Sequence, residues 1–239
     1  MCIRDSLEAI PAFQERTSAP HYLNAALDGS RPAAYRVRLY QPEQQSRVIG
    51  ESTAFHEVVP GHHLQVNVAN DRTELPSAVR FLLFSGFSEG WALYAERLAD
   101  ELGLYSGDAD RFGMGSNFAW RAVRLLVDSG LHAFGMSREE AIELLLANTA
   151  LSQDQAAAEI DRYIAWPGQA SSYMLGYLEI TALRRQAESA LGPGFVLRAR
   201  VEAWLAVEAE RPAPASPQGR ESTSMGSPTA AGPAATTLQ

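Results

Sequence analysis

The sequence has a single cysteine, Cys2, among its 239 residues. One cysteine excludes an internal disulfide bond and a zinc site built from cysteine thiolates. Clusters of lysine and arginine are also missing, and 20 basic against 28 acidic residues give a formal net charge of −8. Because binding to phosphate backbones depends on clustered basic side chains, we expect no nucleic-acid partner. The sequence also lacks a run of about eighteen apolar residues, so we expect no membrane span.

Both ends of the chain differ in composition from the region between them. Residues 1–6 resemble a translated leader of non-native origin, and we expect them to stand outside the fold. Residues 210–239 are rich in proline, alanine, serine, glycine and threonine, with few large apolar side chains. Such a segment cannot bury enough apolar surface to offset its ordering entropy, which predicts a disordered tail. Residues 7–209 are therefore expected to form one domain.

The region from residue 45 to residue 208 shows the pattern of one helix after another. Ser137 and Ser152 each begin a capping-box sequence, which is typical of helix N-termini. Apolar and polar residues alternate only at 34–40, which predicts one short strand. The sequence therefore predicts an all-α fold with a short strand near its N-terminus. The main helices are expected over residues 46–59, 62–70, 77–102, 118–134, 137–148, 152–165, 169–191 and 195–208.

The strongest indication of chemistry is a segment that reads TAFHEVVPGHHLQ, from Thr53 to Gln65. Three of the five histidines and a glutamate fall within eight residues of this segment. Imidazole nitrogens and carboxylate oxygens are common zinc ligands, and H-E-x-x-H is typical of zinc hydrolases. The segment resembles that motif with two additional residues before the second histidine. We therefore interpret it as a zinc site.

An unbroken helix would not hold a metal ion between these histidines. At about 100° and 1.5 Å per residue, His62 would lie about 240° around the helix from His56, and His63 roughly 10 Å further along it. Zinc–nitrogen bonds are only about 2.1 Å long. Pro60 must interrupt the helix, because proline lacks the N–H donor and clashes one turn back. We expect this break to bring the His62 side chain close to that of His56. His63 could instead be the ligand, orient a ligand, or contact the substrate.

The remaining parts of a hydrolytic site have candidates elsewhere. A third ligand is expected from FSEGWALYAE at residues 87–96, where Glu89 and Glu96 share one helix face. Small residues flank Glu89, which makes it the predicted ligand. Glu96 is either a supporting or a solvent-facing carboxylate. Glu57 follows His56 and is the predicted general base.

Two further side chains are candidates for stabilising an oxyanion during amide hydrolysis. Tyr173 is the first, and a tyrosine that simply packs with a satisfied hydroxyl is the alternative. His132 is the second, on a narrow polar stripe that also contains Arg121, Arg124 and Asp128. That stripe is interpreted either as an ion-pair ladder between helices or as a partner of the metal site.

These motifs together resemble the bacterial family called domain of unknown function 885. The resemblance covers about residues 10–198 and rests on FHExxPGHHLQ at 55–65, EGWALYAE at 89–96, WRxxR at 120–124, EIxRY at 159–163 and PGQ at 167–169. The family is α-helical and similar to gluzincin metallopeptidases. It therefore implies a peptidase with one zinc ion and a peptide substrate.

Family members are usually much longer, so the resemblance implies a C-terminal fragment. The chain departs from the family pattern after Phe195, where a Phe-His pair is expected. Two alternatives remain beside the peptidase. One is a helical binding or scaffold protein with a structural histidine cluster, and the other is an inactive fragment of the enzyme.

Overall fold

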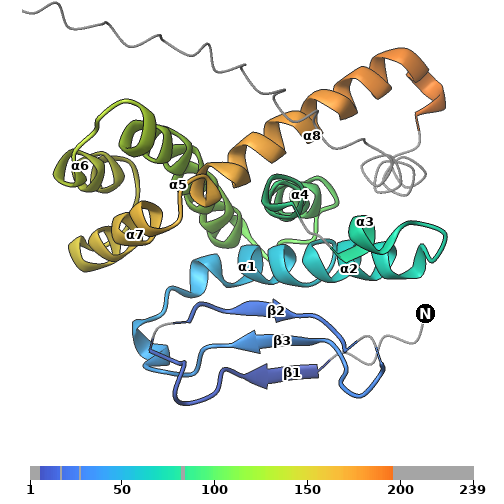
Figure 1. Cartoon of the computed structure of the whole chain (residues 1–239), viewed down its shortest axis with the longest axis horizontal. Helices are drawn as coiled ribbons and strands as arrows, with labels where there is room; N and C mark the ends of the chain where they lie inside the picture. The colour runs from blue at the N-terminus through green and yellow to red at the C-terminus, as the bar shows by residue number, and fades with distance from the viewer. Residues whose placement is uncertain (1–5, 17, 27, 82–83, 196–239) are drawn as a thin grey trace, which may run out of the picture.

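The computed structural model describes residues 6–16, 18–26, 28–81 and 84–195, which are mostly helical (Figure 1). The predicted helical fold class is confirmed. The helices are α1 (Gly50–Glu57), α2 (His62–Asp71), α3 (Ser77–Phe81), α4 (Ser85–Glu101), α5 (Asp108–Ala133), α6 (Arg138–Asn148), α7 (Gln153–Ala165) and α8 (Gln169–Leu191). Short 3-10 turns occupy Pro42–Gln44, Arg47–Ile49 and Gly192–Gly194. No helix in these ranges is long and apolar enough to cross a membrane.

A small sheet lies against the side of α1 and α2 (Figure 1). It consists of β1 (Ser6–Ala9), β2 (His21–Leu23) and β3 (Ala34–Val37) in the order β1-β3-β2. β3 is parallel to β1 and antiparallel to β2. The strand expected at 34–40 is thus confirmed, and two further strands join it. β1 begins at Ser6, inside the predicted leader, whereas residues 1–5, the helix expected at 195–208 and the tail at 210–239 lie outside the described residues, apart from Phe195.

The chain breaks between α1 and α2, as Pro60 predicts. α1 ends at Glu57, α2 begins at His62, and the Val59–Pro60 peptide bond is cis. A Cβ atom on Gly61 would lie 1.9 Å from the carbonyl oxygen of His56, so only glycine fits between the two helices. The indole N–H of Trp91 in α4 donates to the Pro60 carbonyl at 2.9 Å and holds the turn against the core.

Other helix boundaries confirm or correct the expectations. Ser137 and Ser152 both form complete capping boxes. The single helix expected at 77–102 is wrong, because α3 ends at Phe81 and Phe84 has extended backbone angles where α4 begins. α5 starts at Asp108, well before the expected residue 118. The sequence therefore predicted that helices are present in these regions, but it did not predict where they begin and end.

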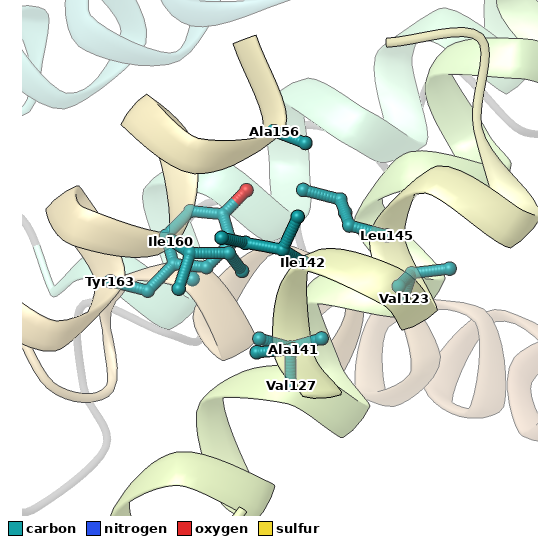
Figure 2. Packing of buried hydrophobic residues seen from close by; sticks show 9 residues of the cluster. Val123, Val127, Ala141, Ile142, Leu145, Ala156, Ile160 and Tyr163 are labelled. Atoms are coloured by element: carbon teal, nitrogen blue, oxygen red, sulfur yellow. The ribbon is translucent and has the colours of Figure 1, made fainter. Parts of the chain in front are cut away.

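Two apolar clusters stabilise the helices. Figure 2 shows the first, in which α5, α6 and α7 pack against each other. Its buried side chains are Val123, Val127, Ala141, Ile142, Leu145, Ala156, Ile160 and Tyr163, joined by Ala170 of α8. The second cluster joins α4 to α8 through Trp91, Tyr94, Leu98 and Ile180. The first cluster therefore packs α5 against α8, and the second packs α4 against α8.

Helices α4 and α8 approach each other closely. A Cβ atom on Gly90 would lie 2.5 Å from the backbone of Gly176, and a Cβ atom on Gly176 would lie 1.8 Å from the carbonyl oxygen of Gly86. Both contacts are with backbone, which cannot move aside as a flexible side chain can. Because Glu89 precedes Gly90, this close packing fixes the position of the Glu89 side chain relative to α8.

Candidate metal centre

Side chains from three helices converge at one point. His56 of α1, His62 of α2 and Glu89 of α4 each offer a ligand atom, and these atoms lie within 4.8 Å of one another. Glu89 Oε2 is 3.5 Å from His56 Nε2 and 3.6 Å from His62 Nε2. Around a tetrahedral zinc ion with bonds of about 2.0–2.1 Å, neighbouring ligand atoms are about 3.3–3.4 Å apart. The donor types and these two spacings are therefore compatible with a bound metal ion.

A chain of buried polar groups orients His56. Its Nδ1 lies 2.8 Å from Glu96 Oε1, and Glu96 is fully buried. Ser52 donates to the other carboxylate oxygen of Glu96, and Asn117 donates to Ser52 Oγ at 3.2 Å. Because Nδ1 is bound to a carboxylate, Nε2 is the nitrogen that faces Glu89. Glu96 is therefore a supporting carboxylate that orients His56, and it does not face solvent.

The two adjacent histidines have different environments. The Nδ1 atom of His62 lies 3.4 Å from both Gln65 Oε1 and Ser88 Oγ, which leaves its Nε2 directed at Glu89. His63 is buried, and its Nδ1 lies 3.2 Å from the hydroxyl of Tyr22 in β2. The structure therefore brings His62, rather than His63, to the other two members of the cluster.

The charges in the cluster favour a cation. Burial alone lowers the pKa of His56, but hydrogen bonds to Glu89 and Glu96 outweigh it and raise that pKa to about 10. Burial alone raises the pKa of Glu89, but hydrogen bonds to His56 and His62 hold it well below its usual range. A carboxylate thus lies at each nitrogen of His56, and a bound metal ion would replace the proton that they stabilise on it.

Glu57, the predicted base, is the last residue of α1. Its Oε2 accepts a hydrogen bond of 2.7 Å from the backbone N–H of Tyr22. Within the described residues its second carboxylate oxygen has no hydrogen-bond partner. Tyr22 also lines a mostly apolar cavity of about 230 Å³, together with His63, Tyr35 and Val58. The sheet therefore holds Glu57 through Tyr22, and the cavity is lined by its neighbour Val58 rather than by Glu57 itself.

Tyr173 and Gln169 of α8 cover the cluster from another side. The Tyr173 ring stacks on the His56 ring with centroids 6.1 Å apart and an interplanar angle of 20°. Gln169 Nε2 donates to the Tyr173 hydroxyl at 3.3 Å and to Glu89 Oε1 at 3.4 Å. Tyr173 is thus adjacent to the predicted ligands, and Gln169, the last residue of the PGQ motif, links it to Glu89.

His132 has a different environment from the other predicted residues. Its Nε2 lies 3.1 Å from the Tyr163 carbonyl oxygen and 3.5 Å from Asp128 Oδ1. Asp128 in turn accepts hydrogen bonds from the backbone N–H groups of Gly168 and Ser171 at the start of α8. Within the described part of the chain, neither side chain contacts the three-residue cluster. They join helices, as one of the two interpretations expects.

The chain is thus a mainly α-helical protein. Its two histidines and one glutamate form a candidate metal centre. A family model described as "Bacterial protein of unknown function (DUF885)" matches residues 3–206, and the chain belongs to this family. No curated protein matches the chain.

Two solved structures are similar to the chain. One is a "putative lipoprotein" from Colwellia psychrerythraea, with 35% identity, a TM-score of 0.80 and coverage of 87% of this chain and 38% of its own. The other is a "putative lipoprotein of unknown function" from Shewanella oneidensis, with 24% identity, a TM-score of 0.66 and coverage of 83% and 39%. The chain thus spans less than two-fifths of the length of both proteins.

Proposed function

We propose that this chain carries the metal centre of a zinc-dependent peptidase. The observation that carries the proposal is the convergence of His56, His62 and Glu89, with donor spacings of 3.5 Å and 3.6 Å. Two imidazoles and one carboxylate are the ligand set of catalytic zinc sites that keep a position open for water. The resemblance of the motifs to gluzincin peptidases supports the same reading.

These three residues would hold the ion, and Glu96 would orient His56. Zinc bound there supplies Lewis acidity that polarises a carbonyl oxygen and brings the pKa of a coordinated water to near 7. Glu96 and the Ser52 and Asn117 side chains behind it keep the imidazole in one tautomer, with Nδ1–H bound to the carboxylate.

Glu57 would act as the general base. One of its oxygens is held by the Tyr22 N–H, which leaves the other to take a proton from the water that attacks the peptide carbonyl. The same carboxyl group then gives this proton to the leaving nitrogen as the C–N bond breaks, so that the products are a carboxylate and an amine. Positioned proton transfer of this kind contributes roughly 10²–10⁴ in rate.

Tyr173 would steady the negative charge that develops on the carbonyl oxygen. Its ring stacks on the His56 ring. Gln169 Nε2 donates to both the Tyr173 hydroxyl and Glu89, which places this hydroxyl near the cluster. A phenol whose oxygen already accepts a hydrogen bond can direct its own O–H toward an oxyanion.

The test combines metal analysis with turnover. We expect one zinc ion per chain and hydrolysis of a mixed peptide library by the zinc-loaded protein. Glu57→Gln should retain zinc and lose roughly 10²–10⁴ in turnover, whereas the exposed Glu139→Gln should retain both. Absence of stoichiometric zinc would exclude the metal centre. Bound zinc without hydrolysis of any peptide would indicate a non-catalytic site, and full activity in Glu57→Gln would exclude its role as the base.

A further inference from the structure

Three arginines, Arg121, Arg124 and Arg162, lie near the candidate metal centre, and two of them bind the same carboxylate. Glu159 Oε2 lies 3.0 Å from Arg124 Nη2 and 2.9 Å from Arg162 Nη2. Arg121 lies one turn before Arg124 on α5, and it has no carboxylate within ion-pair distance in the described part of the chain. The group therefore carries two more positive than negative charges, in a chain whose formal net charge is −8.

Arg121 is the member of this group with unused hydrogen-bonding capacity. Its Nη1 donates to the Asn117 carbonyl oxygen at 3.3 Å, while its Nε is buried without a partner. Buried N–H groups in native proteins are paired in about nine cases out of ten. Burial and the positive charge of Arg124 lower the pKa of Arg121 and outweigh the nearby Glu96 carboxylate, which raises it, so its charge is only partly compensated within the protein. A bound anion would supply both the missing acceptor and the missing charge.

The arginines reach the metal centre through Tyr173 and Gln169. The guanidinium carbons of Arg124 and Arg121 lie 5.0 Å and 5.9 Å from the centre of the Tyr173 ring, whose other neighbour is the His56 ring at 6.1 Å. Gln169 Oε1 accepts from Arg162 Nη1 at 2.9 Å, and its Nε2 donates to Glu89. The distances of Arg121 and His56 from the Tyr173 ring place Arg121 at most about 12 Å from His56. An extended peptide covers about 3.3–3.6 Å per residue, so at most about three to four residues would span that separation.

We propose that Arg121, supported by Arg124, binds a carboxylate of the peptide substrate within about three or four residues of the cleaved bond. The proposal rests on the proposed peptidase function. A guanidinium binds a carboxylate with two parallel hydrogen bonds, which matches the free donors of Arg121. Arg124 is already held by Glu159 and by the Tyr163 hydroxyl at 2.7 Å, so it contributes charge rather than donors. The carboxylate belongs either to the C-terminus of the peptide or to an acidic side chain.

The first experiment measures binding without zinc. Calorimetry on the chelator-treated chain compares N-acetylphenylalanine with its amide, and N-acetylglutamate amide with N-acetylglutamine amide, which separates a terminal from a side-chain carboxylate. We expect one acid to bind at least about tenfold more tightly than its neutral counterpart. Arg121→Met should remove that preference. Arg138 of α6 pairs with Asp161 of α7 at the surface, away from the metal centre, so Arg138→Met should retain the preference for the acid.

The second experiment measures hydrolysis by the zinc-loaded chain. Peptides with a free C-terminus or an internal glutamate are compared with their amidated or glutamine versions. The acid-to-neutral ratio of kcat/KM should exceed about ten for one pair and fall to about one in Arg121→Met. Equal binding of acids and neutral probes by the wild-type chain overturns the proposal, as does a preference that survives in Arg121→Met. A chain that binds the acid but hydrolyses nothing overturns the peptidase function and leaves the anion site standing.

Discussion

Gly61→Ala tests the geometry on which the metal centre depends. The added Cβ atom would lie 1.9 Å from the His56 carbonyl oxygen and 2.4 Å from that of Phe55. Both contacts are with the backbone of α1, so the strain can be relieved only if α1 and α2 separate. His56 lies at the end of α1 and His62 at the start of α2. The separation should therefore move the two imidazoles apart.

Two effects of this substitution can be measured. Overpacking costs typically about 1–3 kcal/mol, which denaturant unfolding of the metal-free protein should detect. Zinc affinity, measured by competition with a chromophoric chelator, should fall as well. Gly115→Ala is the matched control, because no atom lies within 4 Å of its added Cβ on the exposed side of α5. It should stabilise the helix by about 0.8–1 kcal/mol. Wild-type stability and zinc affinity in Gly61→Ala would refute this reasoning.

Three further predictions concern the supporting groups. Glu96→Gln should weaken zinc binding about 10–100-fold, since it replaces the carboxylate that orients His56, and an unchanged affinity would show that the orientation does not matter. Burial raises the pKa of Glu159, but the charges of Arg124 and Arg162 and the hydrogen bonds to Glu159 together outweigh it and lower that pKa below the ordinary 4.5. The stability that ionised Glu159 contributes is therefore present above pH 4.5 and lost as the pH falls through the lowered pKa. The unfolding free-energy difference between wild type and Glu159→Gln should shrink on acidification, and a difference that grows would contradict it. Trp91→Phe leaves a buried carbonyl without its donor and should cost about 1–3 kcal/mol in thermal or denaturant unfolding.

The helical fold and the break in the motif could be predicted because their causes are local. Serine capping boxes and the proline before Gly61 act within a few residues of where they stand. The convergence of His56 and His62 follows from the same break. His63 remained ambiguous in the sequence, since its neighbours His62 and Leu64 do not reveal which imidazole faces α4.

The rest of the site depends on contacts between distant parts of the chain. Ser52 and Asn117 complete the network behind Glu96, yet neither belongs to a recognisable motif, and only the packing of α1 against α5 brings them together. β2 has only three residues, too few for an alternating pattern to be seen, and β1 begins within the segment that was expected to stand outside the fold. The hydrogen bond from Tyr22 to Glu57 depends on that sheet and was equally unpredictable from the sequence.

The central claim is that His56, His62 and Glu89 bind zinc. The two adjacent histidines provide the most direct test, because they differ by one position and only His62 faces the cluster. Zinc stoichiometry and affinity should be measured for wild type, His62→Ala and His63→Ala by metal analysis and chelator competition. We predict that His62→Ala loses stoichiometric zinc while His63→Ala, if folded by circular dichroism, retains one ion per chain. Retention of zinc by His62→Ala with its loss in folded His63→Ala would contradict the account.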